Sequence, residues 1–448
     1  MRIIKAGHDL WQNKFQMWVR RILLKIVKND KLYFIVVMFS VVFIMIASKF
    51  ILGKNAREVL DITVFTTLLL EMLLVMAARY IRIVILNSVE DPNKLTTNYQ
   101  KLIECYSAEK NFMKTDSLSD NEKMPVIHVA WLYDKEIEIH DHPENEYQLP
   151  GIIENHYLEL LTAHETSKIY NSIMIRVDDW NAEKTEGKFL IYSGRTTYYN
   201  SLVTNRAMDY ELQEGISIRK LLECGPIIKP VRYSLLSNHL GFNGFVESAD
   251  GEIMLVFRNK YVSIGKKTYG NSVGASLKSK YALNDENCFT CEGMENAIVL
   301  EIEDELGIHR DELQQDSRGN LGLIHLIAAY RDVVEGGKPQ LLFYVKATIG
   351  KKELEERFYN NVGKPKAVWK RSKESNEKVM KTDGNKLYWI PREKILECKI
   401  YADRIEYNGM KLQMVPSAAA CFAMIRSYFA ETDKGTKNFC CHRSADQL

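Results

Sequence analysis

Three carboxylates in the second half of the chain have the spacing needed to act together. In the acidic segment at 292–308, Glu301, Asp304 and Glu305 are spaced i, i+3 and i+4, so a helix places all three on one face. Gly307 follows at a position where a helix can end in a left-handed residue. Like charges on one face repel, and a divalent cation with hard oxygen ligands removes that penalty. The pattern indicates a metal site, and the alternative is an amphipathic helix with a solvated acidic face.

The same segment resembles the Nudix box, a motif with a first glutamate, seven further residues and a second acidic cluster that ends in glycine. In that family, the matching carboxylates hold Mg²⁺ on the phosphates of a nucleoside diphosphate derivative while water attacks phosphorus. The resemblance therefore implies Mg²⁺ as a cofactor and catalytic roles for Glu301 and Glu305. It implies four metal ligands, which are Glu292, Glu301, Asp304 and Glu305.

Two departures from the box affect what the resemblance implies. The box arginine is Leu300 here, and the box glycine falls at Glu286. Gly274 is left as the glycine of the ligand-binding loop, followed by a polar insertion at 275–287. With these departures, a metal site is still expected, but catalytic turnover is an open question. Whether the chain is an enzyme, as a Nudix hydrolase with a divergent box, therefore stays undecided.

The segments around the box occur in the order that a Nudix fold needs. Residues 240–258 read as strand, turn and strand, because the Asp250–Gly251 pair is flanked by apolar runs. The glycine- and serine-rich stretch at 265–276 predicts a loop. Apolar runs predict two more strands and a closing helix, at 322–334, 340–349 and 416–431.

The region at 125–235 is α+β in texture and carries no assigned chemistry. Its apolar runs predict three strands and one helix, at 126–133, 172–180, 188–194 and 216–223. His140, Asp141 and His142 resemble metal ligands, but they stand between a strand and a proline-containing turn, which predicts a solvated turn. Cys288 and Cys291 form a lone C-x-x-C without a second pair, which favours unpaired thiols.

The first 90 residues are strongly apolar, unlike the rest of the chain. The runs at 32–52 and 62–78 are each long enough to cross a hydrocarbon core of about 30 Å, which predicts a hairpin of two transmembrane helices. Residues 1–31 carry eight Lys or Arg, so the positive-inside rule places both termini in the cytoplasm, at a bacterial inner membrane crossed more than once. Two interpretations of Glu71, inside the second run, stay open: it lines a helix seam in a homo-oligomer or a pore, or it is a protonated glutamate that the span tolerates or that a shifted register moves outward.

The predicted fold class is thus a membrane anchor of two transmembrane helices plus a cytosolic α+β domain of Nudix-like fold, a mixed sheet sandwiched by helices. The predicted segments are a basic amphipathic interfacial helix, the hairpin, a helical linker, the α+β part and the Nudix-like domain, at 1–31, 32–86, 87–124, 125–235 and 236–448.

This domain order resembles the transmembrane-Nudix effectors of bacterial CBASS antiphage systems. The resemblance implies a membrane-bound effector whose Nudix-like domain binds a cyclic nucleotide signal and whose helices then disrupt the bilayer. The alternative is a membrane-anchored, Mg²⁺-dependent pyrophosphohydrolase of nucleoside-diphosphate-linked compounds, and a third reading is an inactive Nudix fold that binds protein. The formal net charge of +2 gives no electrostatic case for DNA as a partner.

Overall fold

The computed structural model describes residues 94–443, apart from 118–121, 165–170, 182–186, 214, 260–261, 263, 316–318 and 363–383. Within these residues no helix is both long and apolar enough to cross a membrane. The longest, α13 (Pro416–Arg443), carries Arg426 and Glu431 within its apolar stretch.

This finding corrects two predictions. The structure gives a mixed α/β fold in place of the predicted anchor-plus-domain fold class, and it does not support the multi-pass placement in the inner membrane with both termini cytoplasmic. The physical reason is that charged side chains interrupt the one described helix of sufficient length. The predicted interfacial helix at 1–31, the hairpin at 32–86 and Glu71 lie outside the described residues.

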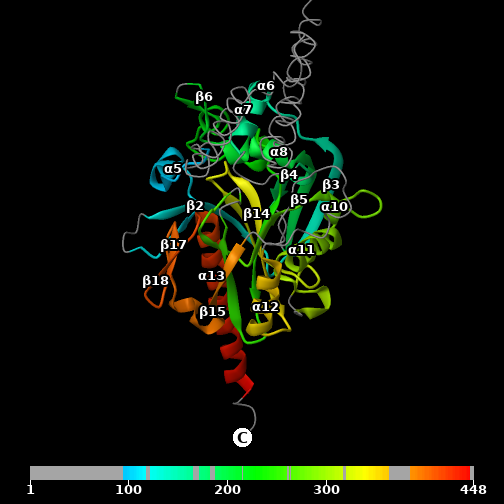
Figure 1. Ribbon diagram of the computed structural model, residues 1–448, viewed down its shortest axis with the longest axis vertical. Helices are drawn as coiled ribbons and strands as arrows, with labels where there is room; N and C mark the ends of the chain where they lie inside the picture. The colour runs from blue at the N-terminus through cyan, green and yellow to red at the C-terminus, as the bar shows by residue number, and fades with distance from the viewer. Residues whose placement is uncertain are drawn as a thin grey trace, which may run out of the picture. The chain divides into compact units, whose positions relative to one another are not determined.

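A ten-stranded mixed sheet forms the centre of the described residues (Figure 1). Its path is β1-β2-β13-β14-β8-β9-β10, with β11 added on β8, β12 on β14 and β15 on β9. The pair β14–β8 is parallel and the other pairs are antiparallel. The strands are β1 (Phe112–Lys114), β2 (Lys123–Trp131), β8 (Gly241–Glu247), β9 (Glu252–Arg258), β10 (Tyr269–Gly270), β11 (Val273–Ser276), β12 (Leu313–Gln314), β13 (His325–Asp332), β14 (Lys338–Ala347) and β15 (Gly384–Pro391).

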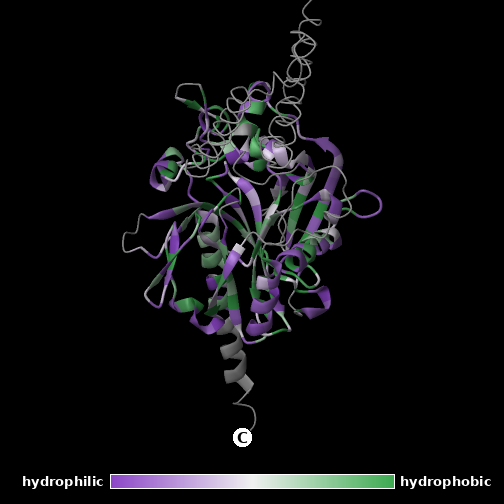
Figure 2. Ribbon diagram, viewed as in Figure 1, coloured by the Kyte–Doolittle hydropathy of each residue, from purple (hydrophilic) through white to green (hydrophobic). Residues whose placement is uncertain are grey.

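Each face of this sheet packs against a helix. Side chains alternate along β14: Leu341 and Phe343 join the core that contains α11 (Cys291–Leu306), while Leu342 and Tyr344 join the core that contains α13. Because both faces are covered, β14 is buried almost throughout. Figure 2 shows hydrophobic residues gathered in the middle of this unit, and hydrophilic ones along β3 and α12 at its outside.

A second sheet packs beside the α11 face, in the order β3-β5-β4. Its strands are β3 (Glu136–Glu146), β4 (Ile173–Asn181) and β5 (Lys188–Thr197), with β3 parallel and β4 antiparallel to β5. Two single bridges tie β4 to the first sheet, Met174 with Lys278 and Arg176 with His239. Strand β2, in the predicted α+β part at 125–235, also pairs with β13 of the predicted domain at 236–448. Residues 91–448 form one compact unit.

A layer of short helices covers one end of the sheets, around a small core of its own. It docks on the turn between β13 and β14, where the buried Glu335 carboxylate receives Arg206 Nε at 3.4 Å and Lys338 Nζ at 3.4 Å. The helices of this layer are α6 (Gly151–Asn155), α7 (Tyr157–Thr162), α8 (Tyr198–Leu202) and α9 (Ile218–Leu222). Helix α5 (Tyr99–Cys105) packs in a separate small core with β2.

The remaining elements connect these layers. They are β6 (Glu211–Gln213), β7 (Ile216–Ser217), α10 (Ser279–Ala282), α12 (Lys351–Asn361), β16 (Lys399–Ile400), β17 (Arg404–Tyr407), β18 (Met410–Gln413) and the 3-10 segments η1 (Asn205–Ala207), η2 (Val231–Tyr233), η3 (Arg310–Glu312) and η5 (Arg392–Glu397).

Candidate functional site

The acidic segment forms one helix, α11, with well-defined ends. At its start, the Thr290 hydroxyl accepts a hydrogen bond of 3.0 Å from the backbone N–H of Gly293. At its end, Gly307 has φ 74 and its N–H donates to the Glu303 carbonyl at 2.9 Å, which confirms the predicted left-handed cap. A side chain at Gly293 would overlap the Ala282 carbonyl, so this glycine lets α10 approach α11 closely.

The structure places the predicted carboxylates in two groups. Glu301 and Glu305 are only 3% and 7% exposed, and Asp304 lies half-buried on the same side of the helix. Glu292 is exposed in the first turn, and nine residues separate it from Glu301, which is about 13 Å along the axis and half a revolution around it. The helix therefore places Glu301, Asp304 and Glu305 on one side and leaves Glu292 apart.

A lysine that the sequence did not suggest contacts this acidic face. The Lys278 ammonium, between β11 and α10, donates a short hydrogen bond to Glu301 Oε1, and both side chains are buried. Lys278 also lies 5.6 Å from the centre of the Tyr281 ring. The sequence gave no signal for this pair beyond two lysines in the polar insertion, because Lys278 and Glu301 belong to different elements.

The observed donor set does not fit a magnesium ion as it stands. Within the residues that the structure describes, no three His, Cys, Asp or Glu side chains lie close enough together to hold a metal. Glu301 is already neutralised by the Lys278 ammonium, and Glu292 is too distant to share an ion with Glu305. Leu300, at the position of the box arginine, is 40% exposed.

The loop predicted at 265–276 is present only in part. Residues 265–268 form a turn, whereas Gly270 and Gly274 pair within β10 and β11. Gly274 pairs with Asn243 of β8, and a Cβ at Gly274 would stand 2.7 Å from the Asn243 Oδ1 atom. The Asn243 amide donates to the Tyr330 hydroxyl at 2.7 Å, and Cys421 Sγ lies 3.1 Å from the same hydroxyl. Gly274 thus makes room for the Asn243 side chain, which hydrogen-bonds to Tyr330 on the neighbouring part of the sheet.

A buried ion pair from the second sheet holds the loop that leads into α11. Asp141 accepts from Arg195 at 2.7 and 2.6 Å, from the Ser193 hydroxyl at 2.6 Å and from the Phe289 N–H at 2.8 Å. Arg195 also donates to the Asn287 carbonyl at 3.1 Å. Burial raises the pKa of Asp141, but the hydrogen bonds from Arg195 and Ser193 outweigh it and hold that pKa below its usual value.

The solvated turn predicted at residues 140–142 is wrong. These residues continue β3, and the Asp141 side chain is only 5% exposed. The two histidines pair with local glutamates, His140 with Glu138 at 2.8 Å and His142 with Glu144 at 3.4 Å. Asp141 is a structural partner of the loop before α11.

An arginine from α12 fixes the other end of α11. Arg357 donates to the Gly307 carbonyl at 3.1 Å and to both oxygens of Glu312, at 2.5 and 2.7 Å. The Arg357 hydrogen bonds lower the pKa of Glu312 to about 2. The basic stretch that follows α12, at 363–381, lies outside the described residues.

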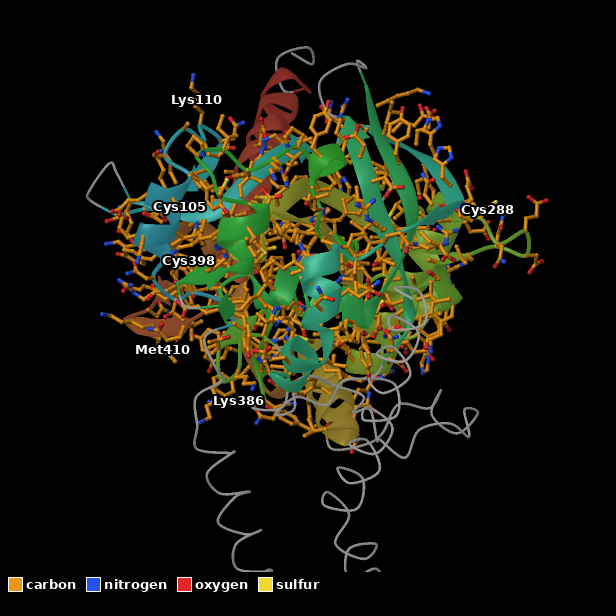
Figure 3. The ribbon with its side chains drawn as sticks, turned by 90° about the horizontal axis from the view of Figure 1, so that it is seen from above. Cys105, Lys110, Cys288, Lys386, Cys398 and Met410 are labelled. Atoms are coloured by element: carbon orange, nitrogen blue, oxygen red, sulfur yellow. The ribbon has the colours of Figure 1, made fainter. Side chains whose placement is uncertain are left out.

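The cysteines near the site are free thiols. Figure 3 shows Cys288 at the outside, on the loop before α11, with Cys105 and Cys398 on the opposite side of the unit. Cys291 opens α11, and its Sγ lies 3.4 Å from the Ile137 carbonyl. Burial raises the pKa of the Cys291 thiol, which makes it a poor nucleophile.

Comparisons with known proteins add little to this geometry. No family model and no curated protein matches the chain. Among solved structures, the crystal structure of DR0079 from Deinococcus radiodurans is similar over 41% of this chain and 80% of that one, with 12% identity and a TM-score of 0.24. A likeness at this level carries no argument about fold or function.

Proposed function

We propose that the region around α11 binds the phosphate groups of a nucleotide and senses that ligand without hydrolysing it. The observation that carries this proposal is the buried ion pair between Lys278 and Glu301. A lysine is a compact point charge that binds phosphate, and here it also neutralises a carboxylate that a phosphate would otherwise meet. The Lys278 ammonium thus lies at the place where the resemblance to the Nudix box implies a metal ion.

The ligand class that we propose to test first is a cyclic nucleotide signal, as in the antiviral effectors that the domain order resembles. A protein that must report a signal gains from holding it intact, and loss of the box arginine at Leu300 agrees with a binding role.

The second candidate is Mg²⁺-dependent hydrolysis of a nucleoside-diphosphate derivative. It is favoured by Glu301, Asp304 and Glu305, which share one side of α11 next to each other. For these carboxylates to bind a cation together, the Lys278 ammonium would have to leave Glu301. Magnesium and Lys278 are therefore competitors for the same carboxylate.

Calorimetry on the full chain, with a panel of cyclic and diphosphate-linked nucleotides in EDTA and in Mg²⁺, separates the two candidates. A sensor binds in EDTA, releases no product on anion-exchange chromatography, and loses about ten-fold or more in affinity on Lys278→Met. Lys188→Met, which removes an exposed lysine paired with Glu138, is the matched control. Product that requires Mg²⁺ and disappears in Glu305→Gln would establish the hydrolase instead, and neither binding nor product would overturn both.

A further inference from the structure

A pocket of about 330 Å³ lies outside the α11 site, at one end of the second sheet. It is formed by the chain that leaves β3, by β4 and by the segment after η2, and this volume is at the lower end of the range for small-molecule sites. Its principal lining residues are Asn145, Glu146, Tyr147, Gln148, Arg176 and Asp178.

In the pocket, the Arg176 guanidinium lies over the Tyr147 ring, and this stacked pair is called the platform below. The Arg176 guanidinium carbon lies 5.3 Å from the centre of the Tyr147 ring. The Tyr147 hydroxyl donates to the Leu235 carbonyl at 2.7 Å, and Arg176 Nη1 donates a short bond to Asp178, so both planar groups are held in place. Aromatic rings and arginine planes are the two kinds of surface on which nucleobases stack in proteins.

The same pocket offers directional hydrogen bonds. Asn145 and Gln148 carry amides, which both donate and accept, and the Glu146 carboxylate is exposed at the rim. A side chain at Gly194 would overlap the Asn145 carbonyl, so this glycine lets the end of β3 close one wall of the pocket.

The charge of the pocket excludes a phosphate as its main occupant. Arg176 is its one cation among the lining residues, and Glu146 and Asp178 outweigh it by one negative charge. A neutral planar ring with amino or ring N–H donors suits two carboxylates and two amides better than an anion does.

The pocket and the Lys278–Glu301 pair are connected through β4. Met174 of β4 bridges to Lys278, and Arg176 stands two residues further along the same strand, about 7 Å away. Backbone bonds on both sides, from Ile175 N–H to the Leu277 carbonyl and from Leu240 N–H to the Ile175 carbonyl, fix this spacing. By the spacing of the backbone, the two places lie within the length of one nucleotide.

We infer that this pocket binds the base of the nucleotide whose phosphates lie at Lys278. The base stacks on Tyr147 and Arg176, and its donors face Glu146, Asn145 and Gln148. The inference rests on the proposed function for the phosphate end, while the base pocket itself is measurable with nucleosides, which have no phosphate.

The test uses the full chain and two separate probes. Adenosine, guanosine, cytidine and uridine are titrated by saturation-transfer NMR, and pyrophosphate is titrated by calorimetry. The expected result is nucleoside binding that weakens by about ten-fold or more on Tyr147→Leu and on Arg176→Lys, because stacking on an aromatic platform is worth about 1–3 kcal/mol. Lys278→Met should leave nucleoside binding unchanged and weaken pyrophosphate binding.

Controls and failures are distinct for the two sites. Arg232→Met removes an exposed arginine paired with Asp179, so this variant should bind nucleosides like the unaltered chain. Lack of nucleoside binding by the unaltered chain overturns the base pocket, as does binding that both platform variants leave unchanged. Nucleoside binding without pyrophosphate binding would overturn the phosphate site and keep the pocket.

Discussion

Two buried ion pairs flank α11, and they differ in how their carboxylates are held. Asp141 receives both nitrogens of the Arg195 fork, a hydroxyl and a backbone N–H, so its two oxygens are engaged in a fixed plane. Glu301 is met by the ammonium of Lys278, a point charge on a flexible stem. An ion pair with several hydrogen bonds in one plane suits a structural role, whereas an ammonium can exchange one anion for another. We therefore infer a structural role for the Asp141–Arg195 pair and a role in ligand binding for the Lys278–Glu301 pair.

The largest effect is expected from breaking the planar pair. Asp141→Ala leaves Arg195 buried without its carboxylate, which should lower the free energy of unfolding by about 3–5 kcal/mol. Urea denaturation followed by circular dichroism measures the change. Glu138→Ala, on the same strand but in an exposed pair with Lys188, is the control and should leave the midpoint where it is. Equal urea midpoints for the two variants would show that the Asp141–Arg195 pair does not stabilise the fold.

A smaller effect is expected from breaking the ammonium pair. Lys278→Met leaves a buried Glu301 and should cost about 1–3 kcal/mol, since an unsatisfied buried acceptor pays its desolvation. Adding Glu301→Gln should restore most of that loss, and the coupling between the two changes gives the energy of the pair. If the double variant is as unstable as Lys278→Met, the pair is not the source of the loss.

A third buried carboxylate is expected to change how stability depends on pH. Burial, and then the neighbouring Glu335, raise the pKa of Asp332 to about 7. Between pH 4 and 7 the folded chain keeps a proton that the unfolded chain releases, so stability falls as pH rises, by at most about 1.4 kcal/mol per pH unit.

Asp332→Asn should abolish this slope, because an amide does not titrate. The fold should be kept, because the amide oxygen can still accept the Val334 N–H that Asp332 accepts at 3.0 Å. Unfolding in urea at pH 5, 6 and 7 measures it. Burial lowers the pKa of the neighbouring Lys338 to about 8, so that group titrates above this window. An unchanged slope in the variant would assign the pH dependence to another group.

Local patterns predicted the elements well. The segments at 126–133, 172–180, 188–194 and 340–349 are strands in the structure, with ends shifted by a few residues. The Asp250–Gly251 turn joins β8 to β9, with Gly251 at φ 78, as the flanking apolar runs predict. These predictions succeeded because periodicity and turn chemistry act over a few neighbouring residues.

Contacts between distant segments escaped prediction. Lys278 and Glu301 meet through packing of α10 on α11, and Asp141 meets Arg195 across a parallel strand pair. Neither contact has a period or a spacing that a sequence reveals. The stretch at 265–276 was predicted as a loop because glycines usually break strands. Gly274 nevertheless lies in a strand, where its lack of a side chain lets Asn243 approach closely.

The strand order of the central sheet also has a consequence for synthesis. Strand β2 lies between β1 and β13, and Ala130 pairs with Ala329. About 200 residues of chain separate these partners, so at roughly 5–20 residues per second β2 waits on the order of 10–40 s with one edge unpaired while the ribosome completes β13. During that interval the nascent chain offers an apolar strand to chaperones, and a pause in translation before residue 325 would lengthen the exposure.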